Sequence, residues 1–244
     1  MIKIVRYHLK TISSTNTWAK ENQHVCDPMG ITLITADAQI SGRGRGSRVW
    51  VSPPLCNIYA SFCFFVPSER WRECGCLTQI AALSMSKIIA ELGLDPEIKW
   101  PNDVLIAGKK IAGILMELVP GDSTYFVVLG IGLNVNMSSE ELALINRPAT
   151  SLAVESGHPF DLANLLEQLT ETFTNDYNLF LQEGFAPFAG VYQQHIQGLF
   201  GKTITYQQGI VYGNGIVESM TPEGYLIVRV RDGSLKVLNS GELL

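Results

Sequence analysis

The sequence lacks the short motifs that mark the commonest nucleotide sites and nucleophilic enzymes. Its 244 residues contain no phosphate-binding loop of the form Gly-x-x-x-x-Gly-Lys-Ser/Thr and no Gly-x-Ser-x-Gly turn of the kind that carries the serine of many hydrolases. Gly130-Ile131-Gly132 lies inside a strand-like run, and no third glycine follows at the spacing of a dinucleotide fingerprint. We therefore exclude a P-loop nucleotidase, an α/β-hydrolase and a Rossmann-type dehydrogenase.

Cysteine, histidine and long apolar runs are also scarce. The five cysteines (positions 26, 56, 63, 74 and 76) and the four histidines are spaced irregularly, which favours idle thiols in a reducing cytosol over a disulfide framework or a zinc site. No apolar run reaches the ~18 residues needed to span a membrane, and the N-terminus mixes charge into a short apolar run, unlike a signal peptide. We expect a cytoplasmic protein without a membrane partner.

Positive charge is scarce in the chain as a whole but concentrated in one segment. The formal net charge is −5, yet three arginines alternate with three glycines in Ser41-Gly42-Arg43-Gly44-Arg45-Gly46-Ser47-Arg48-Val49-Trp50. Arginine presents a rigid fork of N–H donors, and glycine lets the backbone bend and approach a ligand closely. A basic segment on an acidic chain suits a small anion better than a nucleic acid. We expect a clamp that is mobile until the anion binds.

Hydrophobic patterning predicts an α+β fold in which a mixed β-sheet carries helices on one side. We expect helices over residues 17–23, 72–92, 139–145 and 162–183, the second of them ended by Gly93. We expect strands over residues 1–10, 31–36, 57–66, 98–100, 104–106, 110–119 and 125–135. Ala107-Gly108-Lys109 joins two of these strands as a hairpin turn.

The character of the sequence changes after about residue 198. Five short β-like stretches follow in the last 46 residues, separated by glycine-containing turns, which is typical of a small SH3-like β-barrel. We therefore predict one domain over residues 1–198 and a C-terminal barrel over residues 199–244. The barrel carries four lysines and arginines against four aspartates and glutamates, so it offers no basic surface for a nucleic acid.

Two segments fit either a structural or a functional role. In Lys99-Trp100-Pro101-Asn102-Asp103 the proline ends a strand and two short polar side chains follow, which describes an ordinary strand end or part of a site. Strand alternation puts Lys110 on the same face as Ala112, Ile114 and Met116. The lysine then either points into a pocket or extends at the hairpin tip into solvent.

Two glycines within the strand over 125–135 indicate that another group approaches this backbone closely. Gly130 and Gly132 share one face of the strand, and Asn134 lies on the same face. The approaching group is either a neighbouring element of the chain or a ligand.

Together these segments resemble the biotin protein ligase family, and the resemblance covers nearly the whole chain, including the C-terminal barrel. The motifs follow the family's order. They are Ser14-Thr15-Asn16, Gln39 ahead of Gly42-Arg43-Gly44-Arg45, Arg48-x-Trp50-x-Ser52, Lys99-Trp100-Pro101-Asn102-Asp103, Lys110-Ile111-Ala112-Gly113-Ile114-Leu115 and Gly130-Ile131-Gly132-Leu133-Asn134. Some bacterial members carry a DNA-binding domain before the first motif. Here that motif begins at Ser14, so we expect a monofunctional ligase that does not bind DNA.

The resemblance implies an ATP-dependent enzyme with two half-reactions. The substrates biotin and Mg-ATP give biotinyl-5′-AMP and pyrophosphate, and the biotinyl group then passes to a lysine of the biotin carboxyl carrier domain of a biotin-dependent carboxylase. The resemblance assigns no tightly bound cofactor and no metal ligands, since Mg²⁺ is expected to arrive with ATP. The family includes monomers and dimers, so a homodimer is left open.

The resemblance also assigns roles to individual residues. It gives the catalytic roles to Lys110 and Arg45. The residues that it assigns to biotin are Ser14, Thr15, Asn16, Gln39, Arg43, Gly44, Arg45 and Lys110. The residues that it assigns to ATP are Arg43, Arg45, Trp50 and Asn134. For Asn102 and Asp103 three roles stay open: contact with the nucleotide, contact with the metal, or bracing of the site.

Two other functions fit part of the same pattern. Lipoate ligases and octanoyl transferases share the expected fold and also modify a carrier lysine, but the Gly-Arg-Gly-Arg loop, the Lys-Trp-Pro-Asn-Asp segment and the barrel favour biotin. A module that only binds biotin could dispense with Lys110 and the arginines, so their presence favours an enzyme.

Overall fold

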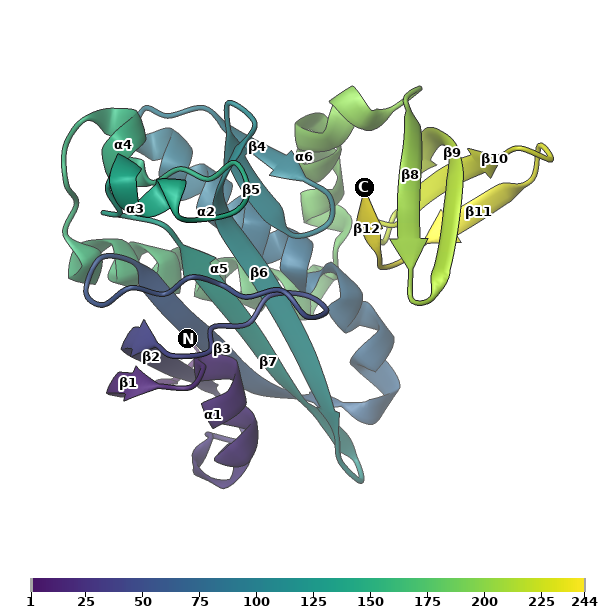
Figure 1. Cartoon of the computed structure of the whole chain (residues 1–244). Helices are drawn as coiled ribbons and strands as arrows, with labels where there is room; N and C mark the ends of the chain where they lie inside the picture. The colour runs from purple at the N-terminus through teal and green to yellow at the C-terminus, as the bar shows by residue number, and fades with distance from the viewer. Residues whose placement is uncertain (1, 244) are drawn as a thin grey trace.

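The larger part of the chain is built on one mixed β-sheet, as predicted (Figure 1). The computed structural model describes residues 2–243. The sheet has seven strands in the order β1-β2-β3-β7-β6-β5-β4, in which β1 and β2 are parallel and the other neighbouring pairs are antiparallel. The strands are β1 (Ile4–Ile12), β2 (Ile31–Gln39), β3 (Ile58–Pro67), β4 (Pro96–Lys99), β5 (Asp103–Ile106), β6 (Lys109–Pro120) and β7 (Thr124–Leu133).

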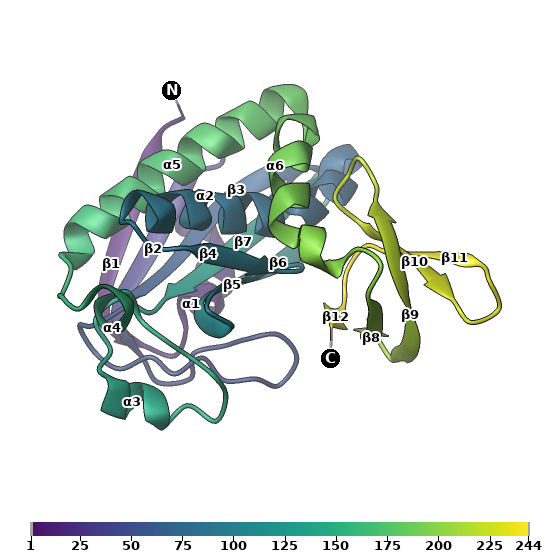
Figure 2. The same ribbon diagram turned by 90° about the horizontal axis from the view of Figure 1, so that it is seen from above.

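The long helices cover one face of this sheet, which confirms the predicted α+β class (Figure 2). They are α2 (Leu77–Glu91), α5 (Leu162–Glu183) and α6 (Ala186–Ile196). The core between helices and sheet combines aliphatic and aromatic side chains, and the ring of Phe62 on β3 lies 4.7 Å from that of Phe173 on α5. Burial of these large apolar groups is the main force that holds the layers together.

The short helix α1 (Thr15–Glu21) lies on the opposite face of the sheet and adds a second, smaller core. This core includes Ala19 of α1 and Phe126 of β7. Helices cover both faces of the sheet, which explains why the first six residues of β2 are all buried. In a strand with one face in solvent, buried and exposed residues would alternate. The remaining helices are α3 (Ser139–Ala143), α4 (Leu152–Ser156) and the 3₁₀ turns η1 (Gln23–Val25), η2 (Ser68–Cys76) and η3 (Gln197–Leu199).

The predicted elements are mostly present, with two kinds of error. The helix expected over 72–92 begins only at Leu77, because the preceding nine residues form the 3₁₀ turn η2. The helices α4 and α6 were not predicted. Helix α4 has only five residues, too few for a periodic pattern, and α6 follows Gly184 with a proline in its first turn.

The C-terminal part forms a separate antiparallel sheet of five strands, the number predicted for the barrel. The strands are β8 (Thr203–Gln208), β9 (Val211–Met220), β10 (Leu226–Val230), β11 (Leu235–Leu238) and β12 (Glu242–Leu243), in the order β11-β10-β9-β8-β12. The division into residues 1–198 and 199–244 stays a prediction, and its outermost residues, Met1 and Leu244, lie outside the described range. All five cysteines are free thiols. Within residues 2–243 no helix combines the length and apolarity needed to cross a membrane.

Candidate active site

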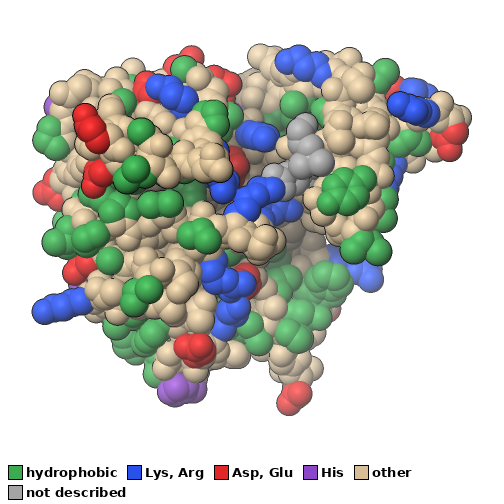
Figure 3. Space-filling view, in the orientation of Figure 1, with side chains coloured by type: hydrophobic (Ala, Val, Ile, Leu, Met, Phe, Trp, Pro, Cys, Tyr) green, Lys and Arg blue, Asp and Glu red, His purple; other side chains and the backbone are tan. Residues whose placement is uncertain are grey.

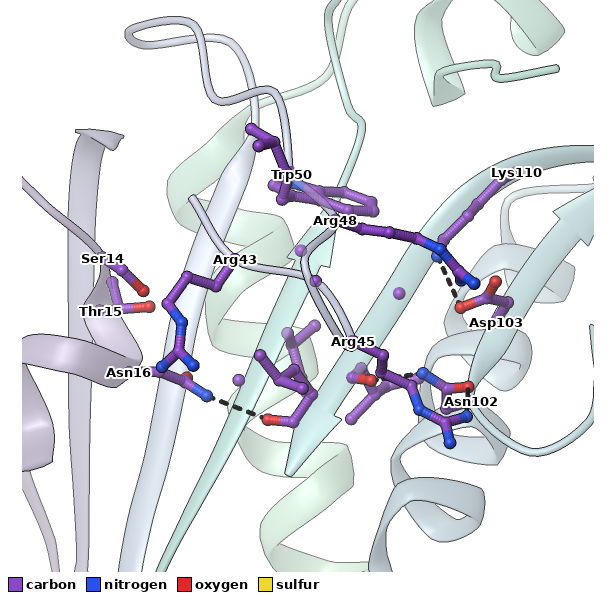
Figure 4. A pocket seen from close by; sticks show the side chains of 18 of the residues that line it. Ser14, Thr15, Asn16, Arg43, Arg45, Arg48, Trp50, Asn102, Asp103 and Lys110 are labelled. Atoms are coloured by element: carbon purple, nitrogen blue, oxygen red, sulfur yellow. Dashed lines mark hydrogen bonds and ion pairs between the residues drawn. The ribbon is translucent and has the colours of Figure 1, made fainter. Parts of the chain in front are cut away.

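A cavity opens on the sheet face opposite the long helices, where the segment between β2 and β3 crosses β6 and β7 (Figures 1 and 4). The hollow spans about 780 Å³, a volume that includes space open to solvent. Lysine and arginine side chains gather on the surface there (Figure 3). The residues that the sequence analysis assigned to ligands and that line the cavity are Ser14, Thr15, Asn16, Gln39, Arg43, Gly44, Arg45, Trp50, Asn102, Asp103 and Lys110.

The N-terminus of α1 forms one wall of the cavity. Ser14 is the N-cap residue in an extended conformation, and within the described chain its hydroxyl makes no capping bond to the helix. The Oε1 atom of Gln39 instead accepts a hydrogen bond from the backbone N–H of Thr15, at 2.9 Å. The other end of the Gln39 amide donates to Ser52 Oγ at 2.9 Å. Gln39 therefore holds this wall in place, and Ser14, Thr15 and Asn16 line the cavity with hydroxyl and amide groups.

Asn16 is fixed by contacts on every side. Its Nδ2 donates to the carbonyl of Leu115 at 3.1 Å and to Glu117 Oε2 at 3.0 Å, and its Oδ1 accepts a hydrogen bond from Ser61 at 2.6 Å. The side chain lies directly over Gly130, where a Cβ would come within 2.2 Å of Asn16 Oδ1. The close approach predicted at Gly130 is therefore made by Asn16.

Glu117 on β6 is a site residue that the sequence analysis missed. Its carboxylate accepts hydrogen bonds from Lys20 Nζ at 2.7 Å and from Arg43 Nη1 at 2.8 Å. Burial alone would raise the pKa of this carboxyl, but hydrogen bonds from Lys20 and Asn16 and the charge of Arg43 hold the pKa below its ordinary value. The available signal was strand alternation, which puts Glu117 on the same face of β6 as Gly113 and Leu115.

Replacing Glu117 with glutamine should destabilise the protein near neutral pH and less so in acid. A carboxylate whose pKa is lowered by folding stabilises the fold above its ordinary pKa of 4.5, and this contribution is lost as the pH falls through the folded pKa. The difference in free energy of unfolding between wild type and Glu117→Gln, measured with urea, should be larger at about pH 7 than at about pH 3.5. Glu97→Gln, at an exposed position of β4, is the control. An equal difference at both pH values would contradict the prediction.

The arginine-rich segment is a small hairpin. Gly44 N–H donates to the carbonyl of Arg48 at 2.8 Å, and Trp50 N–H donates to the carbonyl of Gly42 at 2.9 Å. Gly46 turns the tip with a φ of 63°, a conformation that favours glycine. The hairpin carries Arg43 toward Asn16 on one side of the cavity and Arg45 toward Asn102 on the other (Figure 4). The mobility expected for this segment stays a prediction.

Trp50 lies on a platform of two glycines. Gly113 on β6 and Gly132 on β7 are direct partners across the sheet, so the surface between them has no side chains. A Cβ on Gly132 would lie 2.4 Å from Trp50 Cε2, and one on Gly113 would lie 3.1 Å from Trp50 Cζ3. The second close approach predicted for the Gly-x-Gly segment is therefore made by an indole ring, held flat against the sheet.

Lys110 points into the cavity, but the strand face predicted for it was wrong. A β-bulge shifts the register of β5 and β6, so that Val104 pairs with Ala112 while Leu105 pairs with Lys110. One extra residue in β6 returns the lysine to the face of Gly113, where a Cβ would lie 2.8 Å from Lys110 Nζ. Simple alternation fails here because it presumes an unbroken ladder.

Two residues of the Lys-Trp-Pro-Asn-Asp segment hold the cationic groups. Asp103 Oδ1 accepts a hydrogen bond from Lys110 Nζ at 2.6 Å, and Asn102 Oδ1 accepts one from Arg45 Nη1 at 3.1 Å. Asn102 is itself fixed to β6, because its Nδ2 donates to the carbonyl of Ile114 at 2.6 Å. Of the roles left open for these two residues, the geometry supports bracing.

Burial and neighbouring charges act together on Lys110. Burial lowers the pKa of the lysine, the Asp103 carboxylate opposes this shift, and the charges of Arg147 and Arg48 reinforce it. The ammonium also lies 5.4 Å from the centre of the Trp50 ring. Several cationic groups are thus held close together, an arrangement that favours binding of an anion with several negative charges.

Asn134 lies beside the main cavity, in a smaller hollow that also touches Trp50 and Lys110. Its Nδ2 donates to the carbonyl of Thr150 at 3.0 Å, which ties β7 to the segment that follows α3. That segment contributes Arg147, which lines both hollows and which the sequence analysis did not single out. No motif surrounds Arg147, so only the fold reveals its position.

Comparisons with known proteins show the family of the chain. The sequence profile described as the Biotin/lipoate A/B protein ligase family matches residues 8–134. The Bifunctional ligase/repressor BirA of Bacillus spizizenii is 34% identical over 234 residues, which are 94% of this chain and 70% of that protein. The Biotin--[acetyl-CoA-carboxylase] ligase of Paracoccus denitrificans is 31% identical over 207 residues, which are 82% of this chain and 85% of that protein.

A solved structure shares the fold over almost the whole chain. The biotin protein ligase from Aquifex aeolicus in complex with biotin and ATP has a TM-score of 0.79 at 24% identity, covering 98% of this chain and 97% of that one. By its matching profile and its sequence identity to these relatives, the chain belongs to the biotin/lipoate A/B protein ligase family.

Proposed function

We propose that the protein is an ATP-dependent biotin–protein ligase, which activates biotin as biotinyl-5′-AMP and transfers it to a lysine of a biotin carboxyl carrier domain. The observation that carries this proposal is the convergence of Arg43, Arg45 and Lys110 on one cavity, which the N-terminus of α1 also lines. The two curated relatives described above are named as a bifunctional ligase/repressor BirA and a biotin--[acetyl-CoA-carboxylase] ligase, so the lipoate and octanoate alternative is not favoured.

In the first half-reaction a carboxylate oxygen of biotin attacks the α-phosphorus of ATP. A new P–O bond forms, the bond from the α-phosphorus to the bridging oxygen breaks, and its electron pair leaves with pyrophosphate. Both reactants are anions, so the fixed charges of Lys110 and Arg45 offset their repulsion and stabilise the charge that builds up in the transition state. Mg²⁺ arrives with ATP as part of the substrate and neutralises the leaving group.

In the second half-reaction the amine of the acceptor lysine attacks the acyl carbon of the adenylate. An amide bond forms, the C–O bond to the phosphate breaks, AMP leaves with the electron pair of that bond, and the amine nitrogen loses one proton to solvent. The arginine hairpin over the cavity limits the access of water to the mixed anhydride until the acceptor arrives. The chain needs no covalent intermediate of its own, in keeping with its lack of a nucleophile motif.

The proposal is tested by incubating the protein with Mg-ATP and a carrier domain in three arms, which contain biotin, lipoate or octanoate. Mass spectrometry of the carrier should show a gain of one biotinyl group in the first arm only, with release of pyrophosphate. Modification by lipoate or octanoate in place of biotin would establish the alternative. No gain in any arm would overturn the proposal.

A methyl group on the glycine platform should weaken ATP binding. In Gly132→Ala the new Cβ would overlap the Trp50 ring, which is too large to yield by a small side-chain adjustment. The indole must then leave its place beside Lys110, and the resemblance assigns this ring to ATP, where it would stack near the adenine. Stacking of a base on an aromatic ring contributes about 1–3 kcal/mol, so losing it should lower the affinity by roughly 5- to 150-fold. Titration calorimetry with a non-hydrolysable ATP analogue measures the effect.

Gly190→Ala is the matched control for this variant. Gly190 lies in α6, and no atom of the described chain outside its own helix neighbourhood comes within 4 Å of a Cβ built there. The change should leave nucleotide affinity unaltered and should stabilise the helix slightly. A folded Gly132→Ala protein that binds the analogue like wild type would show that Trp50 does not form part of the nucleotide site.

A further inference from the structure

The turn between β9 and β10 enters a buried socket of the larger domain. Figure 2 shows this turn beside α2 and α6. The carbonyl of Gly224 accepts hydrogen bonds from Gln79 Nε2 at 2.6 Å and from Trp100 Nε1 at 3.4 Å. Gln79 and Trp100 are each 2% exposed. Gly224 has a φ of 85°, and a Cβ there would come within 2.1 Å of Gln79 Oε1, so only glycine fits.

The socket lies directly behind the segment that holds the cationic groups. Trp100 is followed by Pro101, whose carbonyl accepts a hydrogen bond from the fully buried hydroxyl of Tyr192 on α6, at 3.2 Å. The next two residues, Asn102 and Asp103, hold Arg45 and Lys110. On one side, the same five-residue segment is therefore bonded to Gly224 through Trp100 and to α6 through Pro101, and on the other side it holds Arg45 and Lys110. Gln79 of α2 joins this arrangement through the Gly224 carbonyl.

We propose that Gln79, Trp100 and Tyr192, together with the Gly224 carbonyl, are positioning residues that set the place of Lys110 and Arg45 through Asn102 and Asp103. The inference rests on the proposed ligase function. Contact with the C-terminal sheet would then hold the Lys99–Asp103 segment in place, and with it the charges of Lys110 and Arg45.

The chemistry of the socket supports this role over plain packing. Apolar residues would fill the same space without restricting the position of any carbonyl. An amide, an indole N–H and a hydroxyl each require the carbonyl that accepts their hydrogen bond to lie at a defined distance and angle. The three bonds end on two carbonyls, those of Gly224 and Pro101, which belong to separate parts of the chain. A displacement of about 1 Å at a reacting centre is enough to slow a reaction by roughly a hundred-fold.

The test compares Gln79→Leu and Tyr192→Phe with the control Ser84→Ala. The first two remove the donors to Gly224 and Pro101 while the volume is nearly kept. Ser84, on the same helix as Gln79, is 1% exposed and donates to Asp176 Oδ2 at 2.6 Å, away from the Lys99–Asp103 segment. The measured quantities are the single-turnover rate of biotinyl-adenylate formation at saturating substrates, the Kd for biotin and the midpoint of urea unfolding.

Gln79→Leu and Tyr192→Phe should each slow adenylate formation by about ten-fold or more, with the Kd for biotin changed by less than about two-fold. Ser84→Ala should lower the unfolding midpoint without slowing the reaction. If both socket variants are folded and react within about two-fold of wild type, the inference is overturned. It is also overturned if Ser84→Ala slows the reaction as much, since loss of stability would then explain all three. A wild-type protein that forms no adenylate would instead refute the proposed function itself.

Discussion

Replacing Lys110 with alanine is expected to slow the formation of biotinyl-adenylate by about 10²–10³-fold, a loss of ~2.7–4 kcal/mol of transition-state stabilisation. The ammonium is 2.6 Å from Asp103 and 5.4 Å from the centre of the Trp50 ring, and the side chain lines the cavity. Its side chain is only 16% exposed, so water screens it poorly. Removing it leaves the charges of two reacting anions less compensated and leaves the Asp103 carboxylate without its partner, which adds a further repulsive charge.

The rate is measured in single turnovers with saturating biotin and ATP, by following labelled adenylate. Lys109→Ala is the matched control, because Lys109 precedes Lys110 on β6 but pairs with Glu155 at 2.6 Å and is 42% exposed. That variant should react at close to the wild-type rate. A Lys110→Ala protein that forms adenylate as fast as wild type would show that the lysine takes no part in the chemistry.

Much of this site could be predicted from the sequence because its residues lie in short motifs with local physical causes. Glycines inside a strand, such as Gly130 and Gly132, indicate close approach in any fold, and the structure identifies the approaching groups as Asn16 and Trp50. Alternating arginine and glycine likewise indicate an anion site without reference to the rest of the chain. The α+β class followed from long periodic segments such as Leu162–Glu183, whose bounds agree with α5.

The features that escaped prediction depend on contacts between distant segments. The bulge that turns Lys110 into the cavity is set by the pairing of β5 with β6, and periodicity within one strand does not reveal it. Glu117 gains its role only when Lys20, Asn16 and Arg43 converge on it from other elements. The contact between Gln79 and Gly224 joins residues 145 positions apart, and neither belongs to a recognisable motif.

Replacing Arg45 with alanine is expected to slow adenylate formation by about 10²–10³-fold as well, for a different structural reason. Lys110 extends from the sheet, whereas Arg45 is carried by the hairpin and reaches across the cavity to Asn102 Oδ1 at 3.1 Å. The guanidinium therefore supplies charge to the reaction and also fastens the hairpin to the opposite wall. We expect the variant to lose adenylate to the solution faster than wild type, since the hairpin loses this attachment.

Two further variants separate the charge of Arg45 from its attachment. Arg45→Lys keeps the charge but loses the rigid fork of donors, so it should recover part of the rate and retain the adenylate poorly. Arg70→Ala removes an arginine that pairs with Glu73 on the surface, and it should change neither quantity. Rapid filtration of the enzyme–adenylate complex gives the release rate alongside the single-turnover rate. If Arg45→Ala forms adenylate slowly but holds it as long as wild type, the hairpin is fastened by other contacts and Arg45 acts through its charge alone.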